Sequence, residues 1–177
     1  MSFSDDDLPL GDSPRSVVTW VRIDDYSNDS QWFEYGSVGA GLRFGLGVRN
    51  SDWIVIAVDG GALGTQDTPA AGTWVPVVVT YAGGALDTNT ELWIDGVSRT
   101  LSTQAGTTNT TLNTTENLGR LLTSVAGQPV EAALDDVLVF DRVLTPAEIA
   151  FFSGKRNPYG TPYTAPGTGG LIPIILF

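Results

Sequence analysis

The chain has 177 residues, 42% of them hydrophobic, which suits one sizeable core and is short for two domains. The formal net charge of −11 comes from 20 acidic and 9 basic residues, so nucleic acid is not expected as a partner. Because the sequence has no Cys and no His, it excludes disulfides, zinc–thiolate sites and any catalysis that needs imidazole. Carboxylates remain as the only common catalytic groups.

The N-terminal segment is expected to lie outside the core. Residues 1–14 are polar, acidic and interrupted by proline and glycine, which predicts an extended leader. The segment has neither a basic stretch nor an apolar one, so we expect no secretory signal. Alternation over residues 16–23 then predicts a strand with two distinct faces. Its two faces are Val17, Thr19, Val21 and Ile23, and Val18, Trp20 and Arg22.

Further short strands are predicted between turn-forming dipeptides. They cover 31–35, 42–48, 53–58, 74–81, 91–94 and 134–140. Asp95-Gly96 is typical of a tight turn with positive φ angles. The Thr/Asn-rich stretch 102–117 is predicted to form a loop and an edge strand. Many short strands with such turns indicate an all-β sandwich or barrel.

One short helix is predicted near the C-terminus. Thr145, Pro146 and Glu148 form a capping box with proline at the first helical position, and Gly154 ends the helix. The remaining residues 155–177 form a Pro/Gly-rich arm with an apolar end, too short to span a bilayer. That end either folds back as a final strand or docks on a neighbouring subunit as an assembly arm. Its apolar residues are Leu171, Ile172, Ile174, Ile175, Leu176 and Phe177.

The order of these pieces resembles a known family. The stretch 91–96, ELWIDG, resembles the family pattern "lrlYvDG", and 133–149 resembles its strand, turn, capping box and helix ending. Over residues 14–152 the chain is similar to laminin-G-like, concanavalin A-like jelly-roll domains. The resemblance implies an all-β antiparallel sandwich with one short C-terminal helix. With the composition of the two ends, we expect this domain over 15–154 and an extended arm at each end. Family members include lectins, carbohydrate-binding modules, adhesion domains, pentraxins and glycosidases, so fold alone does not decide function.

The acidic residues are the candidates for a metal site. Relatives often bind Ca²⁺ at a loop-lined rim, and Ca²⁺ takes oxygen ligands. The candidate ligands are Asp24, Asp25, Asp135 and Asp136. The alternative is that these residues make structural hydrogen bonds or lie in a solvated loop. No cofactor is expected to be required, and Ca²⁺ is the one candidate.

Aromatic residues near polar loops are the candidates for glycan binding, because exposed rings stack on sugars. The candidates are Tyr26, Asn28, Trp32 and Trp53. The alternative for each aromatic residue is a place in the core or in an interface. Three other tryptophans match aromatic positions at which the family has core or core-edge residues: Trp20, Trp74 and Trp93.

Hydrolytic activity is not expected. The glycosidase branch of the family carries catalytic carboxylates in a Glu-x-Asp-x-x-Glu run, and this chain has none. Two pairs of acids share a strand face in the predicted pattern. They are Glu91 with Asp95, and Glu131 with Asp135.

The first functional hypothesis is a non-enzymatic subunit of a virion surface, such as a phage decoration or fibre protein. Its expected partners are other virion subunits or copies of itself, with cell-surface polysaccharide as a further partner. The alternative is a free carbohydrate-binding module that is extracellular or at the cell surface by a non-classical route. We expect neither nucleic-acid binding nor insertion into a membrane.

Overall fold

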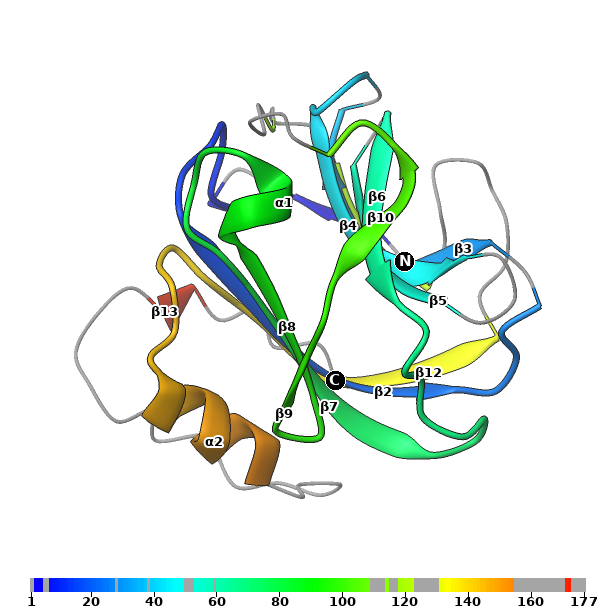
Figure 1. Cartoon of the computed structure of the whole chain (residues 1–177). Helices are drawn as coiled ribbons and strands as arrows, with labels where there is room; N and C mark the ends of the chain where they lie inside the picture. Colours follow the sequence, from blue (N-terminus) through cyan, green and yellow to red (C-terminus); the bar gives the residue numbers. More distant parts are fainter. Residues whose placement is uncertain are drawn as a thin grey trace.

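Two antiparallel β-sheets pack face to face in the computed structural model, and one helix lies outside them (Figure 1). The structure describes residues 2–4, 7–27, 29–37, 39–49, 53–58, 60–108, 114, 118–122, 131–154 and 171–172. Within these ranges only the backbone is described for 2–4, 53, 55, 57, 118, 120, 171 and 172. The jelly-roll sandwich predicted from the sequence is confirmed.

The seven-stranded sheet has the order β1-β11-β3-β4-β5-β6-β10. Its strands are β1 (Ser2–Ser4), β11 (Leu118–Leu121), β3 (Ser30–Gly36), β4 (Arg43–Arg49), β5 (Trp53–Val58), β6 (Gly61–Thr65) and β10 (Ser102–Gly106). The predicted edge strand in the Thr/Asn-rich stretch is β10, and β5 has the predicted bounds. Strand β6 was not predicted, because its sequence GALGT is small and poor in strand-forming residues.

The six-stranded sheet has the order β13-β12-β2-β7-β8-β9. Its strands are β13 (Leu171–Ile172), β12 (Ala132–Phe140), β2 (Arg15–Ile23), β7 (Trp74–Tyr81), β8 (Thr90–Ile94) and β9 (Val97–Arg99). A short helix α1 (Leu86–Asn89) precedes β8. The Asp95-Gly96 turn between β8 and β9 has the predicted positive φ angles, 52° and 73°.

The main core lies between the sheets and follows the alternation of β2. Val17, Val21 and Ile23 enter this core, where they pack with residues such as Phe33 and Phe44 of the other sheet. The opposite face of β2 points away from the seven-stranded sheet. The predicted division of this strand into two faces is therefore confirmed.

Helix α2 (Pro146–Gly154) covers one end of the outer face of the six-stranded sheet (Figure 1). Ile149 and Phe152 of the helix pack on Val18 and Val78 of the sheet in a second apolar cluster. The helix is too short to cross a bilayer, and no other helix in the described ranges is long and apolar enough to do so. At the far end of the same sheet face, beyond α2, side chains reach solvent.

The predicted capping box at the start of α2 is confirmed. Thr145 Oγ1 accepts a hydrogen bond from Glu148 N at 3.3 Å, and Glu148 Oε2 accepts one from Thr145 N at 2.9 Å. Arg142 donates two further bonds to the Glu148 carboxylate, at 2.9 and 2.7 Å. The hydrogen bonds from Arg142 lower the pKa of Glu148 to about 2, with the Thr145 bonds adding to the effect.

Replacing Glu148 with glutamine is therefore expected to destabilise the protein at neutral pH. A carboxyl whose pKa is depressed on folding adds stability above its unfolded pKa, and this stability is lost as the pH falls through the folded value. We expect a loss of about 1–2 kcal/mol at pH 7, limited because the pair with Arg142 is partly solvated. The free energies of unfolding of the two proteins, measured by urea denaturation at a series of pH values, should become equal near pH 2. A difference in the free energy of unfolding that stays constant from pH 7 to pH 2 would contradict the role of the Glu148 charge.

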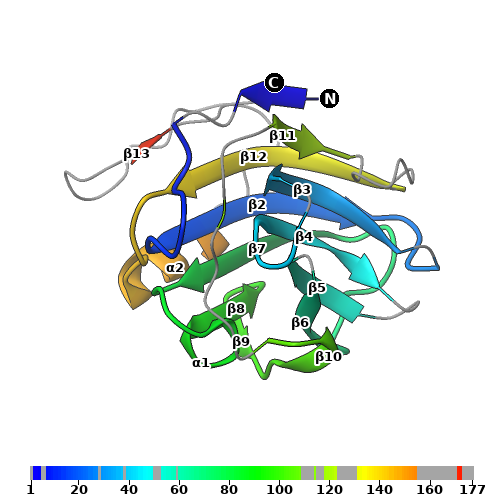
Figure 2. The same cartoon turned by 90° about the horizontal axis from the view of Figure 1, so that it is seen from above.

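The N-terminal leader is extended, but the prediction that it lies outside the core is wrong. Its strand β1 pairs with β11, and Leu8 is only 4% exposed within the main core (Figure 2). Nearby, Arg15 is fully buried and its guanidinium donates to Gly11 O at 2.6 Å and to Tyr35 Oη at 2.7 Å. The Tyr35 hydroxyl in turn donates to Pro9 O at 3.0 Å. This network ties the leader to both sheets.

The described part of the C-terminal arm belongs to the sandwich of its own chain. Leu171 and Ile172 form β13, which pairs with Phe140 and Val139 of β12 (Figure 2). These two residues therefore form a final strand on their own chain, as in the first of the two alternatives. The other predicted arm residues lie outside the described residues: Ile174, Ile175, Leu176 and Phe177.

Candidate functional site

A group of aromatic and charged side chains occupies the outer face of the six-stranded sheet beyond α2. In β2, Val18 lies beneath α2, and Trp20 and Arg22 continue the same face past the helix. Across the sheet, Trp20 is opposite Pro76 and Asp135, and Arg22 is opposite Trp74. We call the group the Trp74 surface. It consists of Trp20, Arg22, Asp24, Trp74 and Asp135.

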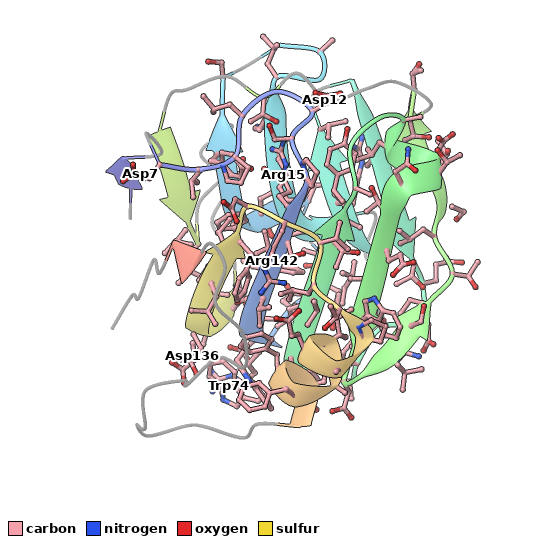
Figure 3. All side chains as sticks on the ribbon, turned by 90° about the vertical axis from the view of Figure 1, so that its left-hand side faces the viewer. Asp7, Asp12, Arg15, Trp74, Asp136 and Arg142 are labelled. Carbon is pink, nitrogen blue, oxygen red and sulfur yellow. The ribbon has the colours of Figure 1, made fainter. Side chains whose placement is uncertain are left out.

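Trp74 is the large apolar side chain that this surface presents to solvent, with 40% of its area exposed. It is the first residue of β7 and directly follows an exposed loop, so no strand residue shields it on that side. Trp20 lies diagonally across the strand pair, where side chains approach within reach of large rings. Figure 3 shows Trp74 and Asp136 at the same end of the molecule, away from Asp12 and Arg15. The two indoles thus lie on a rigid sheet face.

Arg22 connects the aromatic and acidic parts of the surface. Its guanidinium lies over the Trp74 ring, 5.6 Å from the centroid, which is a cation–π arrangement. The same group donates to both carboxylate oxygens of Asp24, at 2.8 and 3.0 Å. These hydrogen bonds to Asp24 raise the pKa of Arg22 above its usual value. Arg22 is thereby held in one orientation beside Trp74.

A β-bulge in β12 places Asp135 and Asp136 at the other side of the surface. Between Asp135 and Leu138 the strand has one residue more than its partner β2, and Asp136 has a φ of 49°. The extra residue reverses the alternation, so that Val137 enters the main core and Leu138 reaches the cluster under α2. Asp136 N donates to Asp135 Oδ1 at 3.0 Å. Burial and the neighbouring Asp136 charge raise the pKa of Asp135.

The structure does not bring the four predicted metal ligands together. Asp24 is held by Arg22, and Asp25 accepts hydrogen bonds from the backbone and hydroxyl of Ser27 at 2.8 and 2.5 Å. These bonds lower the pKa of Asp25. Asp135 lies four positions along β12 from Glu131, whose carbonyl accepts the Asp24 N–H. Over the described ranges, no group of three or more Asp, Glu, His or Cys side chains could hold a metal ion.

The predicted glycan-binding residues lie in different environments. Trp32 has no exposed area and lies in the main core, so its assignment to sugar stacking is wrong. Tyr26 is half-buried, and its hydroxyl donates to Pro69 O at 3.0 Å. Burial raises the pKa of Tyr26 to about 12. Asn28 and the side chain of Trp53 lie outside the described residues.

Trp20 and Trp74 were expected to serve packing, and their place on an open face was not predicted. Trp20 is partly exposed, and its indole nitrogen is buried. A signal for this was present in the sequence. The alternation places Trp20 on the same face as Arg22, and a charged neighbour indicates that this end of the face reaches water.

Comparison with known families and structures agrees with the sandwich. The model of the family described as "Concanavalin A-like lectin/glucanases superfamily" matches residues 1–150. No curated protein sequence matches the chain. Among solved structures, a Bacteroides ovatus protein proposed to bind carbohydrate is similar, with a TM-score of 0.60 and 16% identity. That match covers 91% of this chain and 44% of the other.

Two further structures have the same fold. A heptameric SAP-like pentraxin from Limulus polyphemus has a TM-score of 0.58 and 12% identity, over 83% of this chain and 72% of the pentraxin. The Trypanosoma rangeli sialidase has a TM-score of 0.58 and 19% identity, over 80% of this chain. The chain spans 22% of the length of that sialidase. At these identities the similarity concerns the fold alone.

Proposed function

Because this chain belongs to the concanavalin A-like lectin/glucanase superfamily, we propose that it is a non-enzymatic binding domain that holds a glycan on the Trp74 surface. The observation that carries the proposal is the solvent-exposed indole of Trp74, placed beside Trp20 on the open part of a sheet face. Large aromatic side chains on a soluble protein are normally buried, so an exposed one on a rigid strand indicates a binding surface.

The chemistry of the Trp74 surface suits a sugar. A sugar ring offers an apolar C–H face to an indole, and its hydroxyl groups both donate and accept hydrogen bonds. Trp74 and Trp20 supply the apolar part, and the Asp135 carboxylate supplies an acceptor. Arg22 is already held in place by Asp24, so little conformational entropy is lost when a ligand binds.

The spacing of the acids supports a binding role without hydrolysis. Glycosidases place two carboxyl groups about 5–10 Å apart across the scissile bond. Asp135 comes four residues after Glu131, so their Cα atoms are about 13 Å apart in an extended segment. Asp95 lies in the turn that follows the strand of Glu91. Asp24, the remaining acid of the surface, is occupied by Arg22 on both oxygens.

The test is the replacement of Trp74 with alanine in a glycan-binding assay. A glycan array would first identify ligands, and calorimetry would then compare affinities. We expect Trp74→Ala to weaken binding at least about tenfold, the usual loss when an aromatic anchor is removed. Val143→Ala is the matched control, because Val143 is also 40% exposed but follows β12 near α2. Unchanged affinity in Trp74→Ala would move the site elsewhere, and an array without ligands would refute the function.

We further propose that the domain works on the surface of an assembly, such as a virion, as expected from the sequence. A similar fold in a heptameric pentraxin supports self-association. Light scattering of the full chain and of a version ending at Gly154 would test the role of residues 155–177. An oligomer that becomes a folded monomer on truncation is expected. If both are folded monomers, the free binding module is the better description.

A further inference from the structure

The Trp74 surface lies in a strongly acidic environment. Arg22 is its cation, and both carboxylate oxygens of Asp24 bond to that guanidinium. The carboxylates on or next to the surface, in the part of the chain that the structure describes, are Asp24, Asp25, Asp95, Glu131, Asp135 and Asp136. The whole chain has a net charge of −11, which adds to the local negative potential.

Acids lie at both ends of the row of residues that crosses the sheet through Pro76 and Trp20. Asp95 N donates to Pro76 O at 3.0 Å, so Asp95 lies at the β8 side of the row that contains Pro76 and Trp20. Asp135 is opposite Trp20 at the β12 side of the same row. With about 4.8 Å between neighbouring strands, the row from Asp95 to Asp135 is about 14 Å wide. A ligand on Trp20 would therefore lie beside Asp135, with Asp95 at the other end of the row.

We infer that the Trp74 surface selects glycans that carry free amino groups, such as deacetylated hexosamine oligomers, over neutral and anionic glycans. The inference rests on the proposed function and names its ligand class. An ammonium group on the sugar is attracted by the nearby carboxylates, of which Asp135 lies opposite Trp20. A carboxylate or sulfate on the sugar meets the same carboxylates and is repelled.

The electrostatics of Asp135 agree with this selection. Its carboxyl is partly buried beside a like charge, which raises its pKa, and no cation among the described residues pairs with it. A bound ammonium group would supply that cation. Retaining a residue at a cost in stability is common where the residue serves binding.

The experiment compares three oligosaccharides of equal length with the full chain by calorimetry. They are a β-1,4-linked glucosamine oligomer, its N-acetylated form and an oligouronate. We expect the glucosamine oligomer to bind about tenfold more tightly than the N-acetylated form, and the oligouronate most weakly. The advantage of the amine should shrink at high ionic strength, because salt screens the attraction.

Two variants test the residues. Asp135→Asn and Asp95→Asn should each reduce the ratio of the affinity for the amine to the affinity for the N-acetylated oligomer, and Asp95→Asn should leave the affinity for the N-acetylated oligomer unchanged. Asparagine tolerates the positive φ of residue 95, so the turn is preserved. Asp87→Asn is the matched control, because Asp87 is an exposed acid in α1 at the opposite end of β8. Asp87→Asn should have the same preference for the amine as the unmodified protein.

The outcomes separate the two proposals. If the amine and N-acetyl oligomers bind equally and Trp74→Ala weakens both, the charge selection is overturned and the proposed function stands. The selection is also overturned if the oligouronate binds most tightly. If no oligosaccharide of any charge binds, the proposed function fails and the selection fails with it.

Discussion

Replacing Arg15 with alanine is expected to lower the free energy of unfolding by about 3–5 kcal/mol, measured by urea denaturation at neutral pH. Arg15 is fully buried and donates to Ser13 O at 3.0 Å, Gly11 O at 2.6 Å, Tyr35 Oη at 2.7 Å and Thr114 Oγ1 at 3.1 Å. Alanine would leave these acceptors without their donor in a water-excluded space. It would also leave a cavity in the position of the guanidinium.

The Arg15 cation is compensated by neutral groups. Among the described residues no carboxylate bonds to it, and its guanidinium lies 5.5 to 5.9 Å from the ring centroids of Tyr35, Phe44 and Tyr81. Arginine suits this position because its planar fork can donate in several directions at once and stack on rings. Arg15→Lys keeps the charge without the planar fork. We therefore expect lysine to recover less than half of the free energy of unfolding that Arg15→Ala loses.

Arg99→Ala is the control for the Arg15 experiment. Arg99 forms an ion pair with Asp67, whose side chain is 67% exposed. Such exposed pairs contribute about 0–1 kcal/mol. An Arg15→Ala variant no less stable than Arg99→Ala would show that the network around Arg15 does not hold the leader in place. Hydrogen exchange of the amides of residues 7–12 would report the release of that segment directly.

Replacing Phe152 with alanine is expected to lower the free energy of unfolding by about 3–4 kcal/mol. Phe152 is buried in the cluster beneath α2, where its ring centroid lies 5.5 Å from that of Phe140. Its truncation would open a cavity between the helix and the six-stranded sheet. Phe151→Ala is the matched control, because it is the preceding residue on the same helix and is only partly buried.

The comparison of the two phenylalanine variants tests whether α2 unfolds with the sandwich. We expect Phe151→Ala to lower the free energy of unfolding, measured by urea denaturation, by less than half as much as Phe152→Ala. Equal costs would mean that the two rings contribute alike and that the cluster beneath α2 does not depend on Phe152. If both variants lower the free energy of unfolding only slightly but lose the circular dichroism of the helix, α2 detaches while the sandwich stays folded.

Local patterns predicted much of the fold. The alternation of β2 fixed which residues enter the core, and the capping box at Thr145 fixed where α2 begins. These features depend on residues close together in the sequence. The burial of Leu8 was not predictable in this way, because Tyr35 and Thr114, which help to anchor the leader, are far along the chain.

The candidate site was predicted less well, for two physical reasons. First, sequence periodicity does not tell how far α2 reaches over the sheet, and this reach leaves Trp74 exposed and Val78 buried. Second, the bulge at Asp136 reverses the alternation of β12, which a regular two-residue period does not anticipate. Trp32, predicted to bind glycan, lies in β3 within the predicted strand 31–35, and its side chain is in the core.

The same bulge bears on the behaviour of the protein in concentrated solution. In the part of the chain that the structure describes, β13 pairs with only Val139 and Phe140, so the outer edge of β12 towards Ala132 has no neighbouring strand. A regular apolar edge would add strands from other molecules and lead to aggregation. Two adjacent carboxylates and a bent backbone at Asp135 and Asp136 oppose such growth. The acidic pair therefore protects a sheet edge that no described strand covers, as well as lining a surface.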